Sequence, residues 1–117
     1  MPTSLRLPDK DRKDILEDLA HKLAEQIQHD AKDSIGALMK LVDLGNAVAD
    51  LGRAKDAVQY YSQALEGFEK ILGNDLHPIP DVFMNLATVY YEQREYENAV
   101  QYHRRSLTGY AKASDQV

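Results

Sequence analysis

One internal register constrains this chain more than any other feature of its sequence. The segment Ala57-Val-Gln-Tyr60 recurs as Ala99-Val-Gln-Tyr102, 42 residues later. The same shift superimposes further identical or similar residues: Leu44 on Leu86, Leu65 on Leu107, Gly67 on Gly109, Lys70 on Lys112, Leu41 on Phe83, Gly45 on Ala87 and Phe68 on Tyr110. Self-similarity at a fixed period of this length is typical of stacked helical units. We therefore expect a tandem repeat.

Hydrophobic periodicity predicts helices throughout the chain. Apolar residues recur at helical spacing, and glycine or proline stands at most of the boundaries between the periodic segments. The expected helices begin near residues 9, 35, 54, 80 and 96, and end near residues 31, 52, 72, 93 and 113. Either Asp33 or Ser34 is expected to cap the second helix, and Gly73 to close the third. The expected class is all-α, with about five helices.

The register also predicts how the chain is divided. Residues 34–73 form a first repeat unit and residues 78–113 a second. The helix over residues 9–31 is expected to be a capping helix or a divergent half-repeat, because Ile15, Leu19 and Leu23 fall on packing positions of the third helix at the same shift. A flexible start (residues 1–8) and a polar tail (residues 114–117) complete the chain.

Composition excludes several functional classes. A net charge of −5 argues against a general surface for nucleic acid or anionic membranes. The chain has no cysteine, which rules out disulfides, thiolate catalysis and cysteine-based zinc sites. This composition fits a reducing cytosol, so we expect a cytoplasmic protein. No run of apolar residues is long enough for a membrane span.

Two spacing patterns then identify a family resemblance. The first helix of each unit carries Leu41-x-x-Leu44-Gly45-x-x-Val48 or Phe83-x-x-Leu86-Ala87-x-x-Tyr90, and the second carries Ala57-x-x-x-Tyr61 or Ala99-x-x-x-His103. These patterns resemble the tetratricopeptide repeat. The 42-residue period and the loop before Pro78 are similar to its kinesin-light-chain variety. The resemblance covers about Ile35 to Lys112 and implies a right-handed α-solenoid. Departures from the pattern are Glu69, His103 and Ser106, which replace a proline, an aromatic residue and an alanine.

The resemblance implies protein–protein interaction without catalysis or cofactor. In this family the first helices of the units line a concave surface that binds peptides. The candidate peptide-binding groove therefore consists of Asp43, Asn46, Asp50, Asp81, Met84, Asn85, Thr88, Tyr91 and Glu92. The alternative is simple solvation, because every amphipathic helix has a polar face.

The acidity of this face predicts the kind of peptide. Some family members hold acidic C-terminal tails with asparagines and basic side chains, and Asn46 and Asn85 fit the asparagine places. Val42, however, stands where a basic residue is expected, and the surrounding carboxylates would repel an acidic tail. We therefore expect a neutral or basic peptide, held by Tyr91 and Asn85.

Self-assembly is the rival hypothesis. No further predicted helix covers the fifth one, so Val100, Leu107 and Tyr110 form a candidate surface for homo-oligomerisation; alternatively, the chain is the first part of a longer repeat scaffold. The four histidines lack the spacing of a metal site. No phosphate-binding loop or catalytic signature occurs, and we expect no enzyme.

Overall fold

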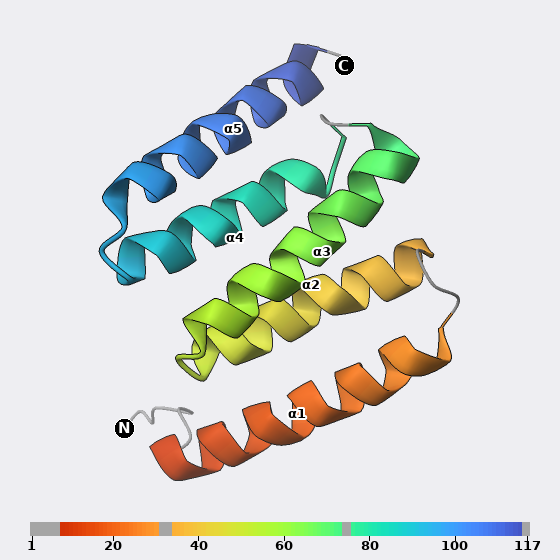
Figure 1. The fold of residues 1–117 in the computed structure, drawn as a ribbon, viewed down its shortest axis with the longest axis vertical. Helices are drawn as coiled ribbons and strands as arrows, with labels where there is room; N and C mark the ends of the chain where they lie inside the picture. Colours follow the sequence, from red (N-terminus) through yellow and green to blue (C-terminus); the bar gives the residue numbers. More distant parts are fainter. Residues whose placement is uncertain (1–7, 31–33, 74–75, 116–117) are drawn as a thin grey trace, which may run out of the picture.

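Five α-helices follow one another in the residues that the computed structural model describes, which are 8–30, 34–73 and 76–115. They are α1 (Asp9–His29), α2 (Ile35–Asp50), α3 (Ala54–Leu72), α4 (Ile79–Glu92) and α5 (Tyr96–Asp115), as Figure 1 shows. The all-helical solenoid expected from the repeat is thereby confirmed. Residues 1–7 of the expected flexible start (1–8), the candidate cap Asp33 and the last two residues of the expected tail lie outside the described residues.

The helix boundaries agree closely with the sequence pattern. Ser34 caps α2, because its side chain accepts a hydrogen bond from the Ala37 backbone N–H at 3.1 Å. Helix α4 begins and ends one residue earlier than expected. Helix α5 continues to Asp115, so residues 114 and 115 belong to the helix and not to the tail.

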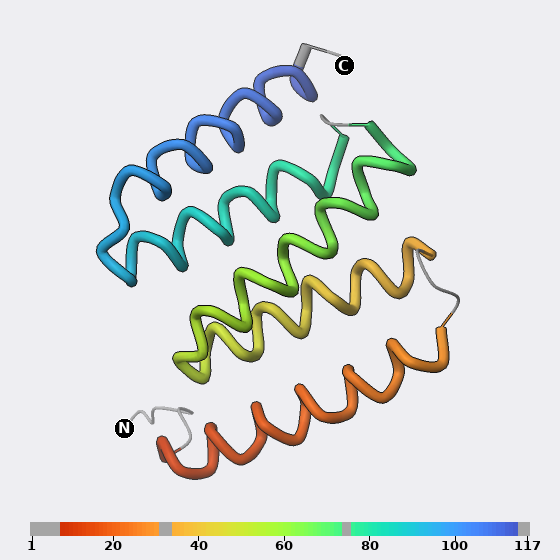
Figure 2. The backbone as a smooth tube through the Cα atoms, viewed as in Figure 1, coloured from red at the N-terminus to blue at the C-terminus, as the bar shows by residue number. Residues whose placement is uncertain are grey.

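The helices stack in chain order, with α1 and α5 at the two ends (Figure 1). Each helix packs against the next, and α2 also contacts α4. Helices α2 and α4 run in one direction and α1, α3 and α5 in the other, as the trace in Figure 2 shows. Because α2 and α4 are the first helices of their units, their equivalent faces point to the same side of the stack.

The turn inside each unit has the same hydrogen bonds. Gly52 and Arg94, one 42-residue period apart, both adopt a positive φ, of 82° and 63°. In the first unit the Arg53 N–H donates to the Val48 carbonyl, and in the second the Glu95 N–H donates to the Tyr90 carbonyl, both at 2.9 Å. The left-handed residue reverses the chain tightly, which places the two helices of a unit side by side. Arginine adopts this conformation at a small energetic cost that glycine avoids.

Close approach at small residues sets the spacing of the helices. A Cβ atom on Gly45 would lie 2.6 Å from Cε1 of the Tyr61 ring. A Cβ atom on Gly67 would overlap Leu38, and one on Gly109 would lie 2.5 Å from Cγ of Pro80. Leu38 and Pro80 are themselves one period apart, so both units use the same helix-to-helix contact. Residues that match at the 42-residue shift therefore also make equivalent packing contacts in the two units.

The hydrophobic core is continuous along the stack and is built mainly from α2, α3 and α4. It includes the buried residues Leu38, Leu44, Tyr61, Phe68, Ile79, Val82 and Leu86. Helix α1 contributes Leu23, but Ile15 and Leu19 are 53% and 44% exposed. Their counterparts Ala57 and Tyr61 are buried, because those residues pack against α2 within their own unit. No described helix precedes α1 to cover it in the same way.

The Gly45 contact can be tested by adding one methyl group. We expect Gly45→Ala to lower the free energy of unfolding by about 1–2 kcal/mol, because the buried Tyr61 ring has no room to move. Gly36→Ala is the matched control: its Cβ would meet only Ser34 Oγ, at 4.0 Å, so this variant should gain about 0.5–1 kcal/mol of helix propensity. Urea denaturation measures both. Equal stability of the two variants would contradict the packing argument.

Candidate functional site

The exposed faces of α1, α2 and α4 form one concave groove. It consists of two neighbouring hollows of about 270 Å³ and 260 Å³, which share Asn46 and Asp50 as lining residues. The first hollow also contains Asn85, Thr88 and Glu92, and the second contains Asp43 together with Leu16, Leu19 and Leu23 of α1. The groove therefore brings together six of the nine residues predicted for it, and α1 adds an apolar wall.

A hydrogen-bonded trio lies at the floor of the groove. The Oδ1 atom of Asn46 accepts hydrogen bonds from the Tyr61 hydroxyl at 2.5 Å and from Nδ2 of Asn85 at 3.2 Å. These two bonds use both lone pairs of the Asn46 oxygen. The Nδ2 group of Asn46 remains a donor and Oδ1 of Asn85 an acceptor. The floor therefore presents amide N–H donors and one amide oxygen acceptor side by side, at the junction of α2 and α4.

The rim of the groove is acidic. Asp43, Asp50 and Glu92 line it, and no Lys, Arg or His is among the lining residues of the two hollows. Burial raises the pKa of the Tyr61 phenol to about 12, and the negative charges of Asp50 and Glu92 add to the rise. The carboxylates therefore act on the floor of the groove, where they favour positive charge and oppose negative charge.

Asp81 is separated from the groove although it lies on the same helix face. Its carboxylate accepts a hydrogen bond from the Tyr110 hydroxyl and pairs with Nδ1 of His77 at 2.9 Å. The hydrogen bond raises the pKa of Tyr110, because the neutral phenol is the donor. The bond between Asp81 and Tyr110 thus joins α4 to α5. The sequence pattern placed Asp81 in the peptide-binding groove and Tyr110 on the oligomer surface, and did not predict a contact between them.

Met84 and Tyr91 line a second, separate groove. It has a volume of about 560 Å³ between α4 and α5, and its lining includes Tyr96, Val100, Arg104 and Leu107. We call it the end groove, because α5 is the last helix of the described stack (Figure 1). The structure therefore places Tyr91 and Asn85, which were expected to hold the same peptide, in different hollows. Thr88 lies between them and lines both.

Two contributions to the concave groove were not predicted from the sequence. Tyr61 was identified from the sequence only as the aromatic position of the second-helix pattern; its ring is buried in the core, but its hydroxyl reaches Asn46 at the floor. Leu19 and Leu23 were assigned to packing positions of the first helix, and together with Leu16 they form the apolar wall. A sequence signal for both was present, since Tyr61, Leu19 and Leu23 follow the repeat register, but a register does not reveal which atom reaches a surface.

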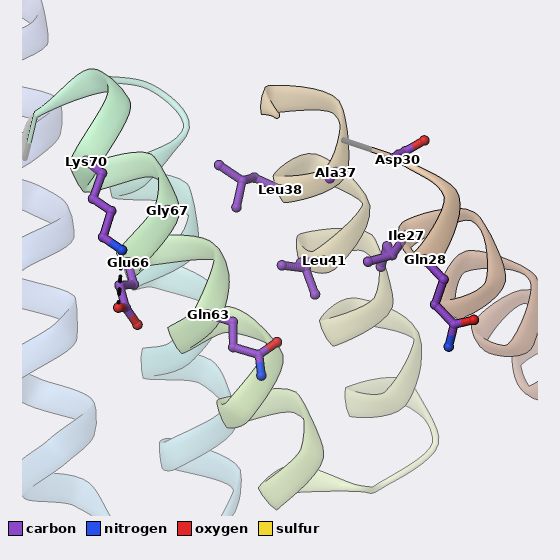
Figure 3. A pocket seen from close by; sticks show the side chains of 10 residues that line it. All are labelled: Ile27, Gln28, Asp30, Ala37, Leu38, Leu41, Gln63, Glu66, Gly67 and Lys70. Carbon is purple, nitrogen blue, oxygen red and sulfur yellow. Dashed lines mark ion pairs between the residues drawn. The ribbon is translucent and has the colours of Figure 1, made fainter. Parts of the chain in front are cut away.

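A third hollow, of about 600 Å³, opens on the other side of α2, between α1 and α3 (Figure 3). Ala37, Leu38 and Leu41 form its floor. All three charged residues that line it are paired, Lys70 with Glu66 at 3.6 Å and Asp30 with Lys40 at 2.9 Å. One period later Phe83 stands in the place of Leu41 and Arg105 in the place of Gln63, and the guanidinium of Arg105 lies 4.3 Å from the centroid of the Phe83 ring.

The chain belongs to the tetratricopeptide repeat family, whose sequence profile matches residues 36–112. Repeats of this family are non-catalytic and generally mediate protein–protein interaction. The crystal structure of BtubC (BKLC) from P. vanneervenii, a kinesin-light-chain-like protein, is similar, with a TM-score of 0.72 and 24% sequence identity over 84% of this chain and 39% of that chain. This likeness concerns the fold, and our chain spans less than half of that neighbour. No curated protein matches the sequence.

Two further findings concern chemistry other than peptide binding. Within the described residues, no group of three or more His, Asp or Glu side chains is arranged to hold a metal ion. None of the helices described has both the length and the apolar character that crossing a bilayer requires.

The environment of Tyr61 predicts an alkaline signature. The unfolded phenol ionises near its ordinary pKa of 10.0 and the folded one at about 12. Between these values the unfolded chain has lost a proton that the folded chain retains, so the free energy of unfolding falls as pH rises through this window. Tyr61→Phe should reduce that fall. Tyrosinate absorbance measures the titration directly, and ionisation of all seven tyrosines together near pH 10 would contradict it.

Proposed function

We propose that this protein is a cytoplasmic interaction module that binds an extended, neutral-to-basic peptide segment of a partner in its concave groove. The Asn46–Asn85 pair carries the proposal. An extended peptide backbone presents carbonyl acceptors and N–H donors along its edge. The free Nδ2 donor of Asn46 and the Oδ1 acceptor of Asn85 match one of each, while the Asn46 oxygen is held in place by the Tyr61 hydroxyl.

Preorganisation supports binding by this pair. The 2.5 Å bond from Tyr61 and the 3.2 Å bond from Asn85 hold the amide of Asn46 in one orientation before any ligand arrives. The ring of Tyr61 is itself fixed against Gly45. Ordering side chains on binding is costly, so a floor that is already ordered makes a weak backbone interaction more effective.

The rim supports selectivity for charge. Asp43, Asp50 and Glu92 attract a lysine or arginine side chain of the peptide and repel an aspartate or glutamate. Leu16 and Leu19 of α1 offer apolar contact to a neighbouring side chain of the same peptide. Val42 is buried in the core and supplies no charge, so the groove lacks a cation for the carboxylate of an acidic tail.

Charge reversal in the groove tests this function. We expect the double variant Asp50→Lys, Glu92→Lys to lose binding to basic members of a peptide array graded from acidic to basic, by about tenfold or more in Kd. The matched control is Asp14→Lys, Glu97→Lys, which changes two exposed acidic residues outside both hollows. Both doubles move the net charge from −5 to −1, since each exchange adds two charges.

The comparison of the two double variants separates the effect of the carboxylates in the groove from the effect of the net charge of the protein. The control should retain the charge preference of the parent chain. If both doubles weaken the binding of basic peptides equally, net charge alone accounts for the preference and the groove is not the site. Asn85→Ala adds a second measurement, because it removes one backbone contact and should weaken basic and neutral peptides to the same extent.

Self-assembly through α5 is a second candidate, supported by the exposure of Val100, Leu107 and Tyr110 at 46%, 51% and 39%. Apolar side chains this exposed on one face mark an interaction surface. If a second copy covers that face, light scattering on the purified chain gives the mass of a dimer at high concentration. Leu107→Glu should then return the mass to that of a monomer. A strict monomer for the parent chain would exclude self-assembly.

A further inference from the structure

The end groove is the surface that α4 covers one repeat earlier. Leu107, which lines the end groove, and Tyr110, one turn further along α5, correspond to Leu65 and Phe68 of α3, 42 residues before them. Leu65 is 8% exposed and Phe68 is 0% exposed, because α4 packs on α3. Their counterparts are exposed, because no helix in the described part of the chain lies over α5 (Figure 1). The molecule therefore contains two equivalent grooves: the groove between α2 and α3 is covered by α4, and the end groove between α4 and α5 is not covered by any described helix.

The occupant inside the chain defines the shape that fits. Helix α4 runs in the same direction as α2 (Figure 2) and buries Ile79, Val82, Leu86 and Val89, which follow a spacing of three and four residues. This is the apolar stripe of an amphipathic helix. The end groove has the same small and apolar lining, with Ala87 and Ala99 in the positions of Gly45 and Ala57. A helix of this pattern is therefore the shape that the end groove accommodates.

The charges of the end groove differ from those of its internal counterpart. His103 replaces Tyr61, and Arg104 replaces Ser62. In the internal counterpart, Glu92 in the last turn of α4 lies in the same hollow as Tyr61. An acidic side chain in the equivalent turn of an incoming helix would therefore lie beside His103 and Arg104, both of which line the end groove. The positive charge of Arg104 selects for such a residue.

Two aromatic rings close one end of the end groove. Tyr91 and Tyr96 meet edge to face, with ring centroids 5.5 Å apart, at the turn between α4 and α5. Tyr91 is 65% exposed, and its internal counterpart is Ala49. Aromatic side chains in a partly open pocket are typical anchors of interfaces. They give this groove a wall that the internal one lacks.

We propose that the end groove binds an amphipathic α-helix of another polypeptide, with an apolar stripe like that of α4 and an acidic residue in its last turn beside His103 and Arg104. This surface is distinct from the concave groove and takes a helix where the concave groove takes an extended segment. A second copy of this chain fits less well. Two α5 helices paired about a twofold axis would bring His103 and Arg104 close to their own copies, which is unfavourable.

The test uses a fluorescent peptide that copies residues 78–93, because this segment is the internal occupant. Anisotropy titration with the full chain should show saturable binding. Leu107→Glu should weaken it by about tenfold or more, because it places a charge in the apolar groove. Ile15→Glu is the matched control, since Ile15 at 53% exposure and Leu107 at 51% are equally exposed but lie at opposite ends of the stack. It should change the Kd by no more than about twofold.

A charge exchange tests the acidic residue. A peptide carrying Glu92→Lys should bind the parent chain about threefold more weakly than the original peptide. The protein variant Arg104→Glu should reverse this preference. Circular dichroism confirms that each protein variant is folded, which is expected because Leu107, Arg104 and Ile15 are all exposed.

Four results would overturn the proposal. They are the absence of saturable binding, equal loss with Leu107→Glu and Ile15→Glu, an unchanged preference in Arg104→Glu, and a dimer that Leu107→Glu converts to a monomer. Equal loss with Leu107→Glu and Ile15→Glu would show that the peptide binds elsewhere, for example in the groove between α2 and α3 after displacing α4. The last would show that a second copy covers the groove.

Discussion

The close contact between Gly45 and the Tyr61 ring is the constraint on which the rest of the structure depends. It allows α2 and α3 to approach until a side chain on Gly45 would no longer fit. The Tyr61 ring fills the core at this contact, and the same geometry directs its hydroxyl to Asn46. Tyr61 therefore both packs between the two helices of the unit and orients Asn46 at the floor of the concave groove. Because the core is close-packed, the fixed position of the Tyr61 ring also fixes the position of its hydroxyl group at the surface.

The second unit repeats the frame with different side chains, and these differences distinguish the end groove from its internal counterpart. Gly109 approaches Pro80 as Gly67 approaches Leu38, so the helix spacing is preserved. Ser106, in the place of Ala64, is buried and donates a hydrogen bond to the Pro80 carbonyl at 2.8 Å, which satisfies a hydroxyl that would be costly to bury alone. The exchanges of Tyr61 for His103 and of Ala49 for Tyr91 leave the frame intact and change the side chains that line the end groove.

Much of the fold followed from the sequence because a helical repeat depends on local periodicity and nearest-neighbour packing. The order of the helices and the bounds of α3 were predicted from apolar spacing and from glycine and proline at the boundaries. The site was predicted less completely. Asn85 and Met84 are adjacent in sequence, yet one faces the concave groove and the other the end groove. Adjacent helical residues point about 100° apart, so a pattern that assigns both to one face cannot separate two hollows that meet along a helix.

The amino-acid sequence by itself determined the family, the 42-residue period, the acidic character of the concave face and the positions of Val100 and Leu107 on the last helix. Only the tertiary structure decided that Asn46 is bonded by both Tyr61 and Asn85, that Asp81 is engaged by Tyr110 of α5, and that α1 forms a wall of the groove. The physical reason is the range of the interactions. Helix formation depends on residues three and four apart, whereas a hydrogen bond between side chains 15 or 29 residues apart requires the packed positions of two helices.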